Sequence, residues 1–106
     1  MLALGTVVYL KGGTKPLMVL ARGTIVEQNE QNVYFDYASC AVPEGLDVEN
    51  VYYFNDSDVD KVIHKGYVSD DEARLEEVFE KWHSENKGEI LKHQGNVESA
   101  ADSKKA

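Results

Sequence analysis

Few residues in this 106-residue chain could bind a metal ion or catalyse a reaction, and the acidic cluster among them lacks the spacing that binding needs. Asp56, Asp58 and Asp60 stand at the first, third and fifth positions of a calcium-binding loop. Such a loop needs glycine at its sixth position and a bidentate glutamate at its twelfth. Lys61 and Tyr67 occupy those positions, so we predict a solvent-exposed acidic turn and no metal site.

The histidines and the single cysteine offer little more. His64, His83 and His93 form no H-E-x-x-H pattern, and the chain has no C-x-x-C pair. We expect His83 to lie on the surface of a helix. Cys40 and His64 are the only nucleophile and base available, but a lone cysteine among small residues is more often a buried apolar group.

The segment Lys11-Gly12-Gly13-Thr14-Lys15 is only superficially like a phosphate-binding loop. It lacks the G-x-x-x-x-G-K-[ST] spacing and precedes a strand pattern instead of a helix. Because Gly-Gly adopts positive φ easily, it predicts a hairpin turn. No enzyme signature remains, so we expect neither an enzyme nor a cofactor.

The charge of the chain is strongly uneven, with a net value of −8. Residues 1–26 carry three bases and no acid, whereas residues 27–60 carry nine acids and no Lys or Arg. Nucleic-acid binders need a basic surface, so we expect no nucleic-acid partner. The acidic block either keeps the domain in solution by pairing with the basic N-terminal strands, or forms a face that steers a basic partner.

The elements that would position these residues are mostly strands. Short apolar or alternating runs bounded by turn residues predict strands over residues 6–10, 17–26, 33–37, 51–54 and 61–64. Gly23 predicts a bulge or bend in the second strand. We expect a polar turn over residues 27–32, turn chemistry over residues 38–46, and a single helical turn capped by Asn55.

A helix follows the strands. Ser69 with Glu72 three residues later predicts a capping box. Four apolar residues then recur at helical spacing: Leu75, Val78, Phe79 and Trp82. Gly88 is a candidate terminator. The expected fold is α+β, a small and strongly bent antiparallel sheet or barrel-like β-roll with one C-terminal helix.

The domain organisation is simple. We expect one compact domain over residues 1–93 and a disordered polar tail over residues 94–106. No apolar run approaches the roughly 20 residues that span a membrane. The chain begins without the basic and apolar segments of a signal peptide and holds one cysteine, which favours a cytoplasmic location without membrane insertion.

Aromatic residues are the other notable feature, with six tyrosines and three phenylalanines. They form either a core and rim cluster or an interface, where tyrosine is enriched. On the interface reading, the candidate anchors are Tyr34, Tyr52 and Phe54, on a sheet face or edge that takes up a partner segment. The candidate acidic residues around them are Asp36, Glu44 and Asp47.

Several segments carry a family resemblance. The opening from Leu4 to Lys15, followed by Leu17-Met18-Val19, resembles a small bacterial domain of unknown function whose members read "lGsVVlLKGGtKkLMI". The remaining matches are Phe35-Asp36-Tyr37, Val42-Pro43-Glu44-Gly45, Tyr53-Phe54-Asn55 with Asp58-Val59, Val62-Ile63 and Gly66-Tyr67. The resemblance covers about residues 4–82.

The resemblance implies a setting beside polymorphic toxins with LXG-type N-terminal domains, in Gram-positive bacteria that use type VII secretion. It implies a non-enzymatic accessory role, as a chaperone or adaptor that binds the toxin before export. Three alternatives stay open: an immunity protein that blocks the toxin's effector domain, a small enzyme or ligand-binding barrel, and a homodimer formed through an exposed strand edge.

Overall fold

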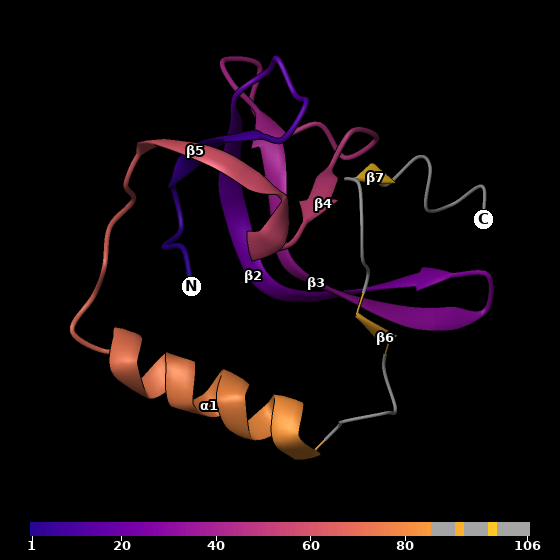
Figure 1. Cartoon of the computed structure of the whole chain (residues 1–106), viewed down its shortest axis with the longest axis vertical. Helices are drawn as coiled ribbons and strands as arrows, with labels where there is room; N and C mark the ends of the chain where they lie inside the picture. Colours follow the sequence, from indigo (N-terminus) through magenta and orange to yellow (C-terminus); the bar gives the residue numbers. More distant parts are fainter. Residues whose placement is uncertain (86–90, 93–97, 100–106) are drawn as a thin grey trace.

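The computed structural model describes residues 1–85 and, further along, the backbone of residues 91–92 and 98–99 (Figure 1). The fold is α+β, as predicted: an antiparallel sheet of five strands is followed by the helix α1 (Glu72–Glu85). The strands are β1 (Val7–Leu10), β2 (Leu17–Gln28), β3 (Gln31–Ala41), β4 (Tyr52–Phe54) and β5 (Val59–His64). Their order is β5-β1-β2-β3-β4, and the sheet is not closed, so the barrel-like alternative is wrong.

Two short strands follow the helix. β6 (Leu91–Lys92) pairs in parallel with β3, and β7 (Glu98–Ser99) pairs with β4. The predicted tail over residues 94–106 otherwise lies outside the described residues, as does Gly88, the candidate helix terminator. The domain boundary at residue 93 therefore stays a prediction.

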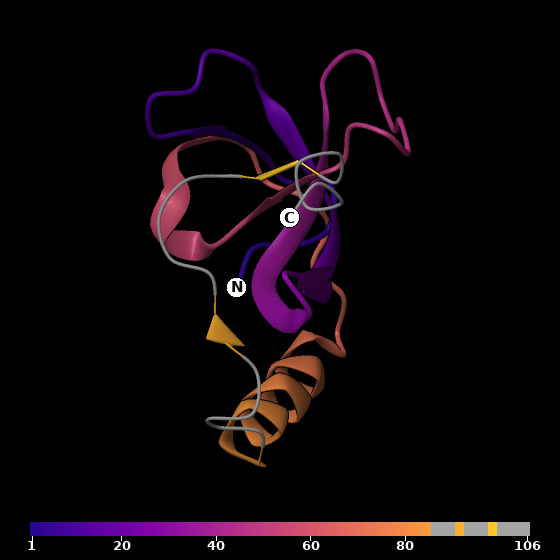
Figure 2. The same cartoon turned by 90° about the vertical axis from the view of Figure 1, so that its right-hand side faces the viewer.

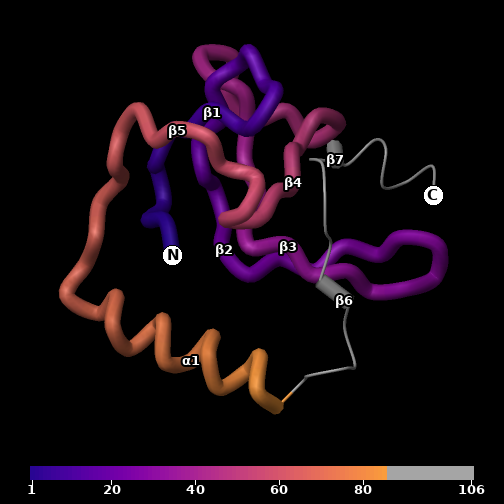
Figure 3. The backbone as a smooth tube through the Cα atoms, viewed as in Figure 1, coloured from indigo at the N-terminus to yellow at the C-terminus, as the bar shows by residue number. Residues whose placement is uncertain are grey.

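β2 and β3 are long strands that bend together, so that their outer halves leave the sheet as a two-stranded arm (Figure 3). A tight turn at Asn29 and Glu30, with φ angles of 51° and 65°, joins them. Two consecutive residues at positive φ reverse the chain in a two-residue loop. The polar turn expected over residues 27–32 is therefore shorter than predicted, and both strands reach further into it.

The irregularity in β2 is not where the sequence predicted it. The register with β3 shifts between Val19 and Ala21, so of the bulge or bend predicted at Gly23 the bulge is wrong. Gly23 instead has a φ of 68°, and a side chain at this position would overlap the ring of Phe79 in α1. Glycine is thus required where the helix crosses the strand.

The core lies on the sheet, and the helix contributes no buried residue to it. It is made of Val8, Leu10, Leu17, Val19, Tyr37, Ala41 and Phe54. Every residue of β3 from Val33 to Ala41 is buried, so this strand is covered on both faces. The turn expected from residue 38 therefore begins only after Ala41, while the predicted burial of Cys40 is confirmed at 1% exposure.

The connections around β5 are held by specific contacts. The predicted helical turn is confirmed as a 3-10 turn over Asp56–Asp58 with Asn55 at its N-cap. After β5, the chain runs down one side of the molecule to α1 (Figure 1). Along this connection the N–H of Gly66 donates to the Thr6 hydroxyl at 3.0 Å. A side chain at Gly66 would overlap the backbone of Leu4.

The start of α1 differs from the predicted capping box. The Ser69 hydroxyl accepts a hydrogen bond from the N–H of Asp71 at 3.3 Å. The Glu72 carboxylate, however, reaches away from Ser69 and accepts two hydrogen bonds from Arg22 of β2. Because Arg22 on the sheet binds the Glu72 carboxylate, Glu72 attaches α1 to the sheet.

Candidate functional site

The structure places two of the three candidate aromatic anchors inside the protein. Phe54 is fully buried and packs on Tyr37, with ring centroids 5.2 Å apart. Tyr34 is 3% exposed, whereas Tyr52 is half-buried at the edge of the core. Phe54 is therefore enclosed in the core, whereas Tyr34, although buried, lines the groove described below.

Asp36 is also buried, and it organises the turn after β4. Its carboxylate accepts a hydrogen bond from the N–H of Asp56 at 2.9 Å, and its own N–H donates to the Asn55 side chain at 2.7 Å. Asp56 in turn accepts a hydrogen bond from the Tyr37 hydroxyl, which also accepts one from the N–H of Leu2. These contacts give Asp36 a structural role.

Glu44 and Asp47 lie on an exposed loop between β3 and β4, at the end of the molecule opposite α1 (Figure 2). Glu44 forms an ion pair with Lys15, which holds the pKa of its carboxyl below the usual value. Hydrogen bonds from the Asn50 side chain and the Glu49 N–H lower the pKa of Asp47. Both carboxylates are therefore charged at neutral pH and reachable by a partner.

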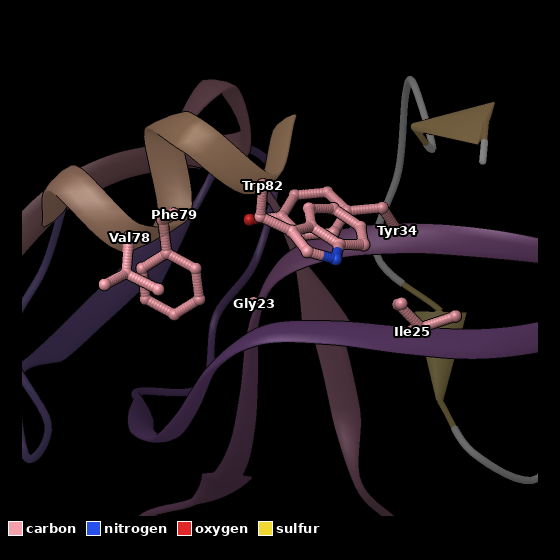
Figure 4. Close-up of a pocket in the computed structure, with 6 residues that line it drawn as sticks. All are labelled: Gly23, Ile25, Tyr34, Val78, Phe79 and Trp82. Carbon is pink, nitrogen blue, oxygen red and sulfur yellow. The ribbon is translucent and has the colours of Figure 1, made fainter. Parts of the chain in front are cut away.

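A concave apolar feature lies elsewhere, between α1 and the arm formed by β2 and β3 (Figure 4). We call it the α1 groove. It encloses about 210 Å³ and is lined by Gly23 and Ile25 of β2, Tyr34 of β3, and Val78, Phe79 and Trp82 of α1. Ile25 and Val78 are 46% and 55% exposed, so the groove is open to solvent at its rim.

Tyr34 forms a fixed wall of this groove. Its ring lies 5.8 Å from that of Trp82 and 4.6 Å from that of His83 in an edge-on arrangement. Its hydroxyl is 3.1 Å from Nε2 of His83. Burial raises the pKa of Tyr34, and the Asp36 carboxylate raises it further. The phenol is therefore neutral, and the wall stays uncharged at physiological pH.

The size and chemistry of the groove suit a protein side chain. Pockets for small ligands and cofactors typically enclose roughly 300–1,000 Å³ and carry several convergent polar groups. The α1 groove is smaller, and five of its six lining residues are apolar or glycine. It fits one or two apolar side chains presented by a partner.

The remaining candidate chemistry is dispersed. His83 is exposed, as predicted, although it also contacts Tyr34. His64 is exposed on β5, whereas Cys40 is buried in β3. Among residues 1–85, no three His, Cys, Asp or Glu side chains come together in a way that could hold a metal ion. Within that same stretch, no helix is long and apolar enough to cross a membrane.

Comparison with known proteins gives one match. A model of a domain of unknown function, DUF4176, matches residues 1–75 of the chain. The chain belongs to the DUF4176 family. No curated protein and no solved structure matches it.

The DUF4176 match ends within the first turn of α1. The sheet and the connection to the helix thus lie inside the matched region, as do Gly23, Ile25 and Tyr34 of the groove. Val78, Phe79 and Trp82 lie beyond it. In this DUF4176 chain, the groove joins a wall from the family domain to a wall from the segment that follows it.

The signal for this site in the sequence is partial. The helical spacing of Val78, Phe79 and Trp82 identified the apolar side of α1, but not that this side remains partly open. Ile25 was missed because an isoleucine in an alternating strand is expected to lie on the buried face, so the pattern does not predict its exposure beside a groove. The bend of the β2–β3 arm, which brings Ile25 opposite the helix, depends on pairing between distant residues.

Proposed function

We propose that this DUF4176 domain is a non-enzymatic protein-binding module that takes up an apolar segment of its partner in the α1 groove. The observation that carries the proposal is the open rim of the groove. Val78 and Ile25 line opposite ends of it and leave apolar surface exposed to water (Figure 4). Concentrated apolar surface of this kind marks sites where proteins meet.

We further propose that the partner is a toxin with an LXG-type N-terminal domain, bound in the cytoplasm before type VII secretion. This step rests on the resemblance described from the sequence. The groove supports only the general part of this proposal, the binding of an apolar segment of another protein. A small domain that holds such a segment would act as a chaperone or adaptor.

A second candidate function is immunity. Glu44 and Asp47 stand exposed on a loop that also presents Leu46 and Val48, which are 63% and 73% exposed. An acidic loop with apolar side chains suits the basic active site of an effector such as a nuclease. In that case the partner region would be the C-terminal effector domain of the toxin.

The experiment that tests the proposal is co-expression with a toxin encoded beside the domain, divided into its N-terminal and C-terminal parts. Capture by the N-terminal part, lost in Val78→Asp and kept in Val48→Asp, supports the adaptor role through the α1 groove. Capture by the C-terminal part, lost in Val48→Asp, supports immunity instead. Capture by neither part, with the domain folded, contradicts the toxin as partner.

A further inference from the structure

We infer that the apolar segment held in the α1 groove is an extended strand of the partner, which pairs with the free edge of β2 beside the groove. The inference rests on the proposed function, because it names the form of the partner element at the same site. It is carried by the pairing of the β2–β3 arm and by the exposed end of the groove at Ile25.

One edge of the arm is paired and the other is not. On the side of β3, the short strand β6 pairs in parallel with Val33 and Tyr34. On the side of β2, β1 pairs only with Leu17 and Met18, and backbone hydrogen bonds to Val19 end the contact. Within the described residues, no strand lies along β2 beyond that point. The outer half of β2 is therefore a free sheet edge.

The turn at the tip of the arm determines which backbone groups this edge presents. The two-residue loop pairs Gln28 with Gln31, and hydrogen-bonded pairs in an antiparallel ladder alternate with non-bonded pairs. Ile25 and Glu27 fall in the non-bonded pairs, so their N–H and C=O groups point away from β3. No described residue binds these groups. They offer two donors and two acceptors to a strand that adds to the sheet.

A strand added at this edge would also cover the exposed end of the groove. Ile25 is 46% exposed and lines the groove with Gly23 (Figure 4). Residues directly opposite each other in an antiparallel pair place their side chains on the same face. The residue paired with Ile25 would therefore lie beside it in the groove, and the residue two positions further along would lie beside Gly23. The segment that fits has an apolar side chain at every second position.

A second copy of the chain fits this edge poorly. Two copies related by a twofold axis would pair their β2 edges antiparallel. In the registers that use both Ile25 and Glu27, Glu27 would lie opposite Gly23, Ile25 or the other Glu27. Its carboxylate would then enter the apolar groove or face a like charge, and both are unfavourable. The occupant is therefore a strand of another protein.

Amide hydrogen exchange, followed residue by residue by NMR on the full chain, tests the free edge first. We expect the amides of Ile25 and Glu27 to exchange at least about tenfold faster than those of Thr24 and Val26, which lie in the hydrogen-bonded pairs. Equal protection of all four amides would overturn the inference, because the edge would already be occupied.

The probe for binding is a synthetic peptide of about seven residues with blocked ends and no aromatic residue. It carries leucine at the even positions, with threonine and lysine at the odd ones. Two control peptides carry N-methyl groups, which remove amide donors. Methyl groups on the leucines block the edge that would face β2, whereas methyl groups on the odd residues block only the opposite edge.

Trp82 reports the affinity of each peptide, because it is the only tryptophan and lines the groove. We expect the peptide methylated on its leucines to bind at least about tenfold more weakly than the other two, since it loses hydrogen bonds to β2. The unmethylated peptide should also slow amide exchange at Ile25 and Glu27.

A pair of variants tests the same edge from the side of the domain. Glu27→Pro removes an N–H group that points away from β3, so the ladder within the arm should persist. Glu27→Ala removes only the side chain. We expect the unmethylated peptide to bind Glu27→Pro at least about threefold more weakly than Glu27→Ala, with thermal unfolding confirming that both variants are folded.

The other outcomes overturn the inference. Equal affinity for the three peptides, or binding that leaves exchange at Ile25 and Glu27 unchanged, would show that the occupant does not pair with β2. Binding of none of the peptides would exclude a strand of this kind. Capture of the toxin then decides the proposed function separately: if capture is lost in Val78→Asp, only the extended strand is wrong, and if Val78→Asp captures normally, both fail.

Discussion

At the scale of single residues, glycine allows two backbone segments to approach more closely than a side chain would permit. Gly66 packs against the backbone of Leu4, and a Cβ there would overlap it. Gly12 has a φ of 76° but nothing within 4 Å of the position that a Cβ would take. A comparison of the two positions therefore separates the cost of a steric overlap, at Gly66, from the cost of a positive φ alone, at Gly12.

We predict that Gly66→Ala destabilises the domain by about 3 kcal/mol, because the backbone of the N-terminal turn must move to admit the methyl group. Gly12→Ala should cost only about 1 kcal/mol, the cost of a positive φ in alanine. Urea unfolding of both variants measures the difference. Equal losses would mean that the approach of Gly66 to Leu4 does not stabilise the fold.

The buried tyrosines give the stability a pH dependence. Burial raises the pKa of both Tyr34 and Tyr37 above the usual 10.0, and the hydrogen bond to Asp56 adds to the effect for Tyr37. The unfolded chain therefore loses these phenolic protons at lower pH than the native state. Stability from this source is complete below pH 10 and is lost as the pH rises above it.

We expect the free energy of unfolding to fall above pH 10 by up to about 1.4 kcal/mol per pH unit for each of the two tyrosines. Urea unfolding between pH 8 and pH 11 measures this slope. Tyr37→Phe is less stable at every pH, because Leu2 and Asp56 lose their partner, but its slope should be smaller. An unchanged slope in Tyr37→Phe would contradict the contribution of Tyr37 to the pH dependence of stability.

At the scale of elements, the attachment of α1 depends on the ion pair between Arg22 and Glu72. Nη1 of Arg22 lies 3.0 Å and 2.7 Å from the two carboxylate oxygens, and the side chains are 10% and 16% exposed. Removing one partner leaves the other charge desolvated, so each single variant should lose more than the pair itself contributes.

We predict a coupling free energy of about 1–2 kcal/mol in a double-mutant cycle of Arg22→Ala and Glu72→Ala, measured by urea unfolding. The ion pair between Lys15 and Glu44 is the comparison, since its side chains are 51% and 54% exposed. It should show little coupling, because water screens both charges. A coupling free energy as large for Lys15 and Glu44 as for Arg22 and Glu72 would mean that burial does not set the strength of these ion pairs.

The elements themselves could largely be predicted from the sequence, because their signals are local. Alternation, turn residues and the helical spacing after Ser69 identified five strands and α1 to within a few residues. β3 was predicted too short at its C-terminal end, because its residues 38–41 are small and carry no alternation. Their burial comes from the strands on either side, which no local pattern records.

At the scale of the whole molecule, the acidic loop between β3 and β4 and the helix α1 lie at opposite ends (Figure 2), and the apolar groove lies beside that helix. The sequence analysis missed Ile25 of the groove and placed the aromatic anchors, Tyr34 among them, beside the acidic residues on one face. Alternation tells which side chains share a face of a strand, not whether another layer covers that face. The separation of the two surfaces is therefore a property of the tertiary structure alone.

The same separation distinguishes folding from binding. Phe54→Ala removes a fully buried ring and should cost about 3–5 kcal/mol of stability, so any loss of toxin capture follows unfolding. Val78→Asp places a carboxylate on a side chain that is 55% exposed, so the stability should change by less than about 1 kcal/mol. It nevertheless puts a charge on the apolar lining of the α1 groove.

Thermal unfolding and capture measured on the same samples test this contrast. If Val78→Asp folds as the original chain does and fails to capture the toxin, the α1 groove is the binding surface and its helical side contacts the partner. If Val78→Asp captures normally while Leu46→Asp or Val48→Asp does not, the contact lies on the acidic loop. The preferred toxin region should then be the effector domain, because the exposed carboxylates of that loop complement a basic site.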